Sequence, residues 1–107
     1  VALVGRKADK LERVAAESAE DGGDASIWPL DIRDEASVDE AMAGILERHG
    51  GVQGLVNNAG GQFPAPLAAI SQKGWETVVR TNLTGGFLMA KACFAQYMAD
   101  HGGAIVN

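Results

Sequence analysis

Two adjacent amides stand where an apolar segment gives way to glycine. Asn57 and Asn58 follow an apolar pair, and Ala59 and Gly60 come next. Asparagine is a poor strand former, and an unpaired buried amide costs about 1–3 kcal/mol, so both side chains need partners. One amide can bond neighbouring backbone and fix the turn, while the other faces a ligand that approaches the glycine backbone closely. We therefore expect a ligand site at the end of this segment.

A second candidate position follows the first apolar run of the chain. Gly5 ends that run, and the cations Arg6 and Lys7 follow. Cations at a helix N-terminus oppose the helix dipole by about 0.3–1 kcal/mol each, a cost that a bound phosphate would remove. The guanidinium fork of Arg6 suits a phosphate, whereas an acidic residue there would hold a ribose hydroxyl. The pattern favours NADP(H) over NAD(H); the alternative is that both cations simply solvate a helix start.

Two further polar residues break apolar surroundings. Asp31 ends the second apolar run and can accept a hydrogen bond from an adenine amino group, with Ile32 packed beside the ring; the alternative is a turn or capping aspartate. Asn82 interrupts an apolar helical stretch, an inconsistency typical of functional sites; the alternative is a satisfied core asparagine. Because Gly85 and Gly86 each cost about 1 kcal/mol relative to alanine in a helix interior, we expect close packing or a kink there.

The elements that position these residues alternate between strands and helices. The pattern predicts strands over residues 1–4, 26–30, 54–57 and 104–106, and helices over residues 7–20, 34–49 and 71–100. Asp34 and Ser71 are the expected N-caps of the last two helices. Strands that alternate with helices form a parallel sheet with helices on both faces, so the fold class is α/β and doubly wound.

Composition narrows the class of partner. The chain has 107 residues, is 47% apolar and carries a net charge of −5, which argues against nucleic acid or an anionic membrane. With one cysteine and two distant histidines, we expect no metal site. The absence of a long apolar run predicts a soluble, cytoplasmic protein. Both ends lie inside strand-like runs, so the sequence is interpreted as a fragment lacking both ends.

Four motifs together resemble those of the classical short-chain dehydrogenases/reductases: the strand end at residues 5–7, Asp31–Asp34, Asn57–Gly60, and Asn82 within residues 81–85. The resemblance covers essentially all 107 residues. It implies that residues 1–107 are an internal fragment of a single NAD(P)-binding domain with a Rossmann-type fold. The family's first strand, its glycine-rich loop and its catalytic Ser, Tyr and Lys would lie outside the fragment. That first strand lies beside residues 1–4 in the family's sheet, so its absence predicts a gap at the sheet's centre.

The resemblance also implies roles for individual residues. Asn82 would be a catalytic residue that organises a water in the proton relay. The NADP(H) cofactor would be held by Gly5, Arg6, Lys7, Asp31, Ile32, Asn57, Asn58, Ala59 and Gly60. Within the family, residues 57–63, 71–75 and 101–107 look most like trans-2-enoyl-CoA and 2,4-dienoyl-CoA reductases of fatty acid metabolism. The implied activity is NADP(H)-dependent reduction of an enoyl-CoA or dienoyl-CoA thioester, with acyl-CoA contacts from Arg33, Phe63 and Ser71.

Other activities stay open at this point. One alternative is a family member acting on a carbonyl or alcohol substrate, such as a 3-oxoacyl, steroid or polyol compound. Another is a dinucleotide-binding protein without catalysis. The resemblance further implies a homo-oligomer, a dimer or tetramer that assembles through the helix at residues 71–100. A receiver-type or flavodoxin-like module is disfavoured, because it would place acidic or phosphate-cradling loops where residues 57–61 stand.

Overall fold

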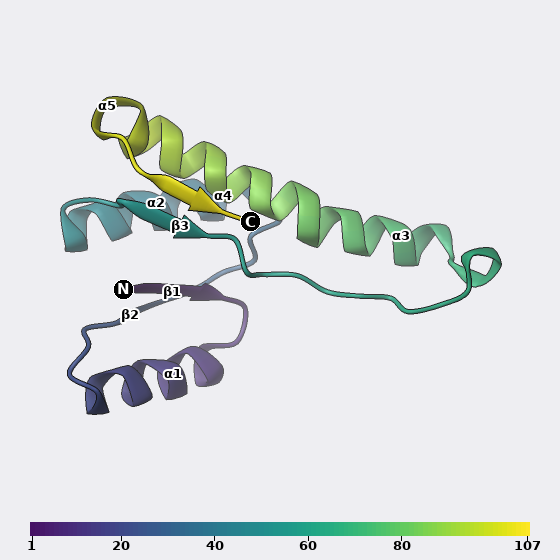
Figure 1. The fold of residues 1–107 in the computed structure, drawn as a ribbon, viewed down its shortest axis with the longest axis horizontal. Coiled ribbons are helices and arrows are strands. Elements are labelled where there is room, and N and C mark those ends of the chain that lie inside the picture. The colour runs from purple at the N-terminus through teal and green to yellow at the C-terminus, as the bar shows by residue number, and fades with distance from the viewer.

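Strands and helices alternate along the whole chain in the computed structural model, which describes residues 1–107 (Figure 1). The elements, in order, are β1 (Ala2–Gly5), α1 (Ala8–Glu20), β2 (Ser26–Pro29), α2 (Glu35–His49), β3 (Gly54–Val56), η1 (Leu67–Ala69), α3 (Gln72–Val79), η2 (Arg80–Gly85), α4 (Gly86–Cys93), η3 (Phe94–Met98), α5 (Ala99–His101) and β4 (Ala104–Val106). The α/β class predicted from the alternation is confirmed.

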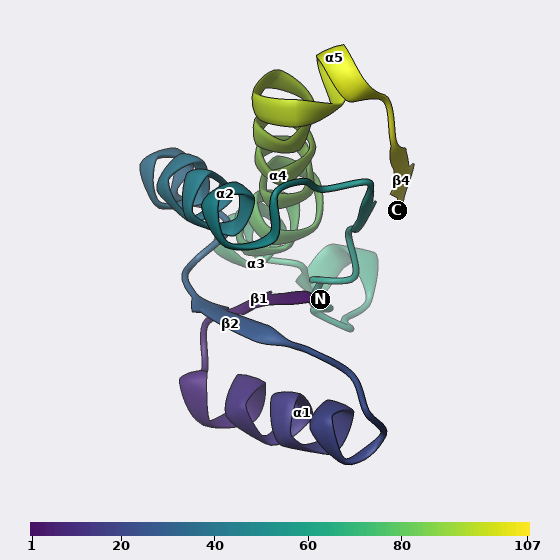
Figure 2. The ribbon, with the colours of Figure 1, turned by 90° about the vertical axis from the view of Figure 1, so that its left-hand side faces the viewer.

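The strands form two parallel pairs rather than one sheet. β1 pairs with β2, with Leu3 opposite Ile27, and β3 pairs with β4, with Leu55 opposite Ile105. No hydrogen bonds join β1 to β3. Their facing edges border a cleft of about 730 Å³, which also touches α2 and α4. Figure 2 shows the two pairs lying apart, in agreement with the gap expected at the sheet's centre.

Helices cover both sides of the strands, as expected for a doubly wound arrangement. α1 packs on one side of β1 and β2, and α2 and α4 lie on the other side (Figure 2). The apolar stripe of α2 buries Val38, Met42 and Ile45 almost completely. Asp34 caps α2 as predicted, because its carboxylate accepts from the Ser37 N–H at 3.1 Å. Gly50 ends the helix in the left-handed conformation, with φ of 73°.

The segment predicted as a single helix over residues 71–100 is continuous but changes its winding. Ser71 caps it as predicted, accepting from the Gly74 N–H at 3.1 Å. α3 then passes into the π-helical segment η2, and α4 passes into a second π-helical segment, η3. π-Helical segments occur mostly as local bulges and are frequent at functional sites. The irregularity of η2 falls on residues 80–85, where the glycine pair had indicated a kink.

The apolar core lies between α2 and α4. Its buried members are Ile32, Val38, Met42, Leu88, Met89, Ala92, Cys93 and Met98. Cys93 has no exposed surface, and burial raises the pKa of its thiol. It therefore behaves as a small core hydrophobe rather than a reactive thiol. None of the helices combines the length and the apolar run that crossing a bilayer requires.

Candidate functional site

The carboxyl ends of the strands lie at one edge of the molecule. β1 and β3 run in the same direction (Figure 1), and each is parallel to its partner strand. Pairing continues past β2, because Leu30 N–H donates to Gly5 O at 2.9 Å. Asp31 is thereby placed beside Arg6, whose positive charge contributes to lowering the pKa of the Asp31 carboxyl. Residues that follow three different strands thus gather where parallel folds bind ligands.

Asp31 is held by Arg33 through a two-pronged contact. Arg33 Nε lies 2.8 Å from Asp31 Oδ1, and Nη2 lies 2.5 Å from Oδ2. The backbone N–H of Arg33 also donates to Oδ1 at 3.0 Å. These hydrogen bonds from Arg33 lower the pKa of Asp31 to about 2, against a smaller opposing effect of burial. The same contact raises the pKa of Arg33. Asp31 therefore stays ionised, and Arg33 fixes its direction.

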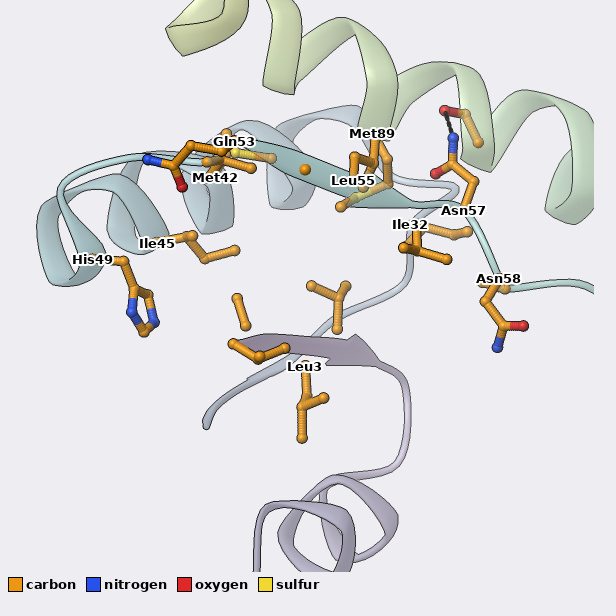
Figure 3. Close-up of a pocket in the computed structure, with 18 of the residues that line it drawn as sticks. Leu3, Ile32, Met42, Ile45, His49, Gln53, Leu55, Asn57, Asn58 and Met89 are labelled. Atoms are coloured by element: carbon orange, nitrogen blue, oxygen red, sulfur yellow. Dashed lines mark hydrogen bonds between the residues drawn. The ribbon is translucent and has the colours of Figure 1, made fainter. Parts of the chain in front are cut away.

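Asn57 and Asn58 point in opposite directions from the end of β3 (Figure 3). Asn57 turns toward the long helix, where its Nδ2 donates to Gly86 O at 3.3 Å and to Asn107 Oδ1 at 2.9 Å. Asn58 points away from that helix and makes no side-chain hydrogen bond. Asn57 thus holds the turn through its amide, while the amide of Asn58 is unpaired and its contact with a ligand stays a prediction. Whether Asn57 itself touches a cofactor stays a prediction.

Asn82 reaches from η2 to the loop that follows β3. Gly61 N–H donates to Asn82 Oδ1 at 2.8 Å, and Asn82 Nδ2 donates to Gly61 O at 2.9 Å. A side-chain amide has two acceptor lone pairs and two N–H donors, so one of each remains for another partner. Asn82 is exposed, which differs from the alternative of a satisfied core asparagine. A Cβ at Gly60 would stand 3.2 Å from Asn82 Oδ1, so Gly60 lets the loop approach this amide.

One glycine of the pair in the long helix, Gly85, serves close packing. A Cβ at Gly85 would stand 2.5 Å from Ile32 Cδ1, so Ile32 occupies the space that this glycine leaves. A Cβ at Gly86 would make only ordinary contact, at 3.7 Å from the Asn57 amide. Ile32 is 8% exposed and belongs to the core while it also borders the cleft. Its predicted packing beside adenine is limited to that small exposed area.

The segment between β1 and α1 offers groups of the kind that can hold a phosphate. Arg6 is exposed and engages no carboxylate within salt-bridge distance. Lys7 occupies the N-cap of α1 without a side-chain cap, so the first N–H groups of that helix keep their donor capacity. Asn58, Ala59 and Gly60 are exposed at the same edge. Cations and unpaired N–H groups are the donors that phosphate prefers. No cluster of metal-ligating side chains occurs.

Of the three predicted substrate contacts, Phe63 and Ser71 lie close together, because the Phe63 ring and Ser71 Oγ both stand within 3.2 Å of the position that a Cβ on Gly74 would take. Phe63 lines a second pocket near α3, while Arg33 is paired with Asp31 beyond β2. Ser71 serves as a helix cap and does not line that pocket. The roles of all three residues toward substrate are not tested by these contacts.

Sequence reasoning missed the partner of Asn82. The motif at residues 57–63 gave no contact between Gly61 and Asn82, yet both backbone polar groups of Gly61 bind the Asn82 side chain. Trp75 and Val78 were also missed as neighbours of Asn82 in the second pocket. Their spacing gave a usable signal, because residues three or four positions apart on a helix share a face.

A family model described as short chain dehydrogenase matches residues 1–107. The D-threitol dehydrogenase of Mycolicibacterium smegmatis is 35% identical over 107 residues, which are 100% of this chain and 41% of that protein. The solved structure of a citronellol catabolism dehydrogenase from Pseudomonas aeruginosa is 57% identical, with a TM-score of 0.95, over 100% of this chain and 44% of that one. A variant of the actinorhodin polyketide ketoreductase, solved with NADPH, is 35% identical, with a TM-score of 0.94, over 100% of this chain and 42% of that one. The chain thus spans about two fifths of the length of the proteins it matches.

Proposed function

The chain belongs to the short-chain dehydrogenase family, and from that premise we propose that the protein is an NADP(H)-dependent oxidoreductase acting on an alcohol or carbonyl group. The observation that carries the proposal is that Arg6, Asp31 and Asn58 each follow the carboxyl end of one of the parallel strands β1, β2 and β3. In addition, the actinorhodin ketoreductase variant was solved with NADPH. Family members bind a nicotinamide dinucleotide; the preference for the phosphorylated form rests on Arg6.

Each residue at the edge has a distinct proposed task. Arg6, which follows β1, binds the 2′-phosphate through its guanidinium. Asp31, held by Arg33, accepts from the adenine amino group. Asn58, together with the small residues Ala59 and Gly60, borders the adenosine ribose. When bound, NADP(H) exchanges a hydride with the substrate carbon. Asn82 uses its remaining N–H and lone pair to hold a water in the path of the substrate proton.

The proposed substrate class differs from the first expectation. An enoyl-CoA or dienoyl-CoA thioester has less support than its alternative, an alcohol or carbonyl compound. The names of the similar proteins refer to D-threitol, citronellol catabolism and polyketide ketoreduction. None of these three names refers to an enoyl thioester. We therefore propose an alcohol or carbonyl compound as the substrate, and an enoyl thioester is the competing outcome of the experiment.

We further propose that residues 1–107 are part of one longer NAD(P)-binding domain. The cleft between β1 and β3 has a strand edge on each side, and unpaired edges of this kind favour pairing with a further strand. A parallel strand of the same domain would complete the sheet there.

On the long helix, Leu83, Phe87 and Phe94 are 59–68% exposed. We propose that this face joins two copies in a cytoplasmic homo-oligomer, which size-exclusion chromatography with light scattering would detect as a dimer or tetramer.

The test is steady-state kinetics of the full-length protein with NADPH, NADP⁺ and their non-phosphorylated counterparts. Substrates should include D-threitol, a secondary alcohol, the matching ketone and crotonyl-CoA. Turnover of an alcohol or ketone is the expected result. Turnover of crotonyl-CoA alone would restore the thioester reading. Tight NADPH binding without turnover of any of these compounds would favour a dinucleotide-binding protein without catalysis.

A further inference from the structure

Asn82 lines a second pocket, separate from the cleft between the strand pairs. Its volume is about 310 Å³, at the lower end of the range of about 300–1,000 Å³ for small-molecule sites. The apolar part of its lining comes from Phe63, Ile70, Trp75 and Val78. No residue of the lining carries a charge. The pocket therefore joins an apolar surface to the amide that the proposed function assigns to the proton path.

The Phe63 ring packs against Gly74 of α3 in this pocket. A Cβ at Gly74 would stand 3.0 Å from Phe63 Cδ1 and 3.1 Å from Cε1. The ring thus rests where α3 lacks a side chain, and Gly74 itself is buried. Although its ring packs against Gly74, Phe63 is 51% exposed, and Trp75 is 63% exposed. Two aromatic side chains held in place yet open to solvent form an apolar surface able to receive a ligand.

The lining discriminates between classes of ligand. Each hydroxyl of a polyol would need a hydrogen-bond partner, and burying one without a partner is unfavourable. The polar groups of the lining side chains are the amides of Gln62 and Asn82 and the single indole N–H of Trp75, and Asn82 already uses one donor and one acceptor on Gly61. The phosphates of coenzyme A would need cations, which the lining lacks. A hydrocarbon chain needs neither.

We propose that this pocket is the subsite for the hydrocarbon part of the substrate, which the protein binds as an aliphatic alcohol or carbonyl compound rather than as a polyol. The inference rests on the proposed function, because it places the reacting carbon at the Asn82 end. The hydrocarbon chain lies between Phe63 and Trp75. Affinity then grows with chain length by about fourfold for each methylene group that enters the pocket.

The experiment measures binding directly, apart from turnover. Full-length protein saturated with NADP⁺ is titrated with ethanol, 1-butanol, 1-hexanol, 1-octanol and sorbitol while tryptophan fluorescence is recorded. The difference between wild type and Trp75→Phe isolates the signal of Trp75. We expect a saturable change in Trp75 fluorescence with each alcohol. The alcohol concentration at half-maximal change should decrease from ethanol to 1-octanol, and sorbitol should give no saturable change. Phe63→Ala should weaken 1-octanol binding about tenfold and ethanol binding less than twofold.

A control variant separates the pocket from the surrounding loop. Leu67→Ala removes another large apolar side chain of the same segment, which is 87% exposed and does not line the pocket. It should leave the binding of 1-octanol unchanged. Three results would overturn the inference. The alcohol concentration at half-maximal fluorescence change could be independent of chain length, Trp75 could respond to sorbitol as it does to 1-octanol, or no alcohol could produce a response. If the same preparation still turns over D-threitol, the proposed oxidoreductase function survives that failure.

Discussion

Asn82 and Gly61 bind each other through two hydrogen bonds, Gly61 N–H to Asn82 Oδ1 at 2.8 Å and Asn82 Nδ2 to Gly61 O at 2.9 Å. They join the π-helical segment η2 to the loop that follows β3. This amide therefore positions the loop and keeps one donor and one acceptor unused, which the proposed function assigns to a water.

Asn82→Ala should lower kcat of the full-length enzyme by about a hundredfold, the lower end of what proton-transfer catalysis contributes. The dissociation constant for NADPH should change far less, because the predicted cofactor contacts lie on other residues. Thr81→Ala is the matched control, since its hydroxyl donates only within the helix, to Thr77 O at 3.0 Å. Equal effects of the two substitutions on kcat would contradict the role given to Asn82.

The Asp31–Arg33 pair should make stability depend on acid pH. The folded pKa of Asp31, about 2, lies below its ordinary value of 3.8. Its contribution is therefore complete above pH 3.8 and is lost as the pH falls through about 2. Because the Asp31 side chain is 35% exposed, solvent screening reduces the contribution to about 1 kcal/mol.

Arg33→Gln tests this pair by urea denaturation of the full-length protein at several pH values. The free energy of unfolding at pH 7 should be lower in the variant, because the charge pairing with Asp31 is lost. The difference should shrink between pH 4 and pH 2, as Asp31 becomes protonated in both proteins. A difference that stays constant over this range would show that Arg33 acts by packing alone.

Gly85 and Gly86 should respond differently to the same substitution. Gly85→Ala places a Cβ 2.5 Å from Ile32 Cδ1, so the core must shift, at a net cost of about 1–2 kcal/mol. Gly86→Ala meets nothing closer than 3.7 Å and gains helix propensity, so it should be neutral or slightly stabilising. Thermal denaturation of both variants gives the comparison. Equal melting temperatures would mean that Ile32 does not pack against Gly85.

Residues 1–107 expressed alone should neither melt cooperatively nor bind NADPH tightly. The facing edges of β1 and β3 are unpaired across a cleft of about 730 Å³, and exposed edges favour association with other chains. Circular dichroism during heating and a fluorescence titration with NADPH check this. A sharp transition together with tight binding would refute the proposal that a further strand completes the domain.

The sequence was sufficient for the fold class, because apolar periodicity and glycine stops depend on local chemistry. Both predicted N-caps, Asp34 and Ser71, hold in the structure for the same reason. The change to π-helical winding at residues 80–85 was indicated only as a kink or close packing, from the glycine pair at residues 85 and 86. The partner of Asn82 lies 21 positions away, beyond the reach of local patterns. The resemblance to a family supplied the roles, and the structure supplied the distances.

The central claim is that Arg6 selects the 2′-phosphate of NADP(H). The direct measurement compares the dissociation constants of NADPH and NADH between the full-length wild-type protein and its Arg6→Asp variant. Lys10→Asp makes the same change of charge within α1 and serves as the control. A lost charge-assisted contact predicts NADPH binding weaker by about ten- to a hundredfold in Arg6→Asp, with NADH binding unchanged or tighter. Lys10→Asp should leave the ratio of the two constants near that of the wild type. An unchanged preference in Arg6→Asp would contradict the claim.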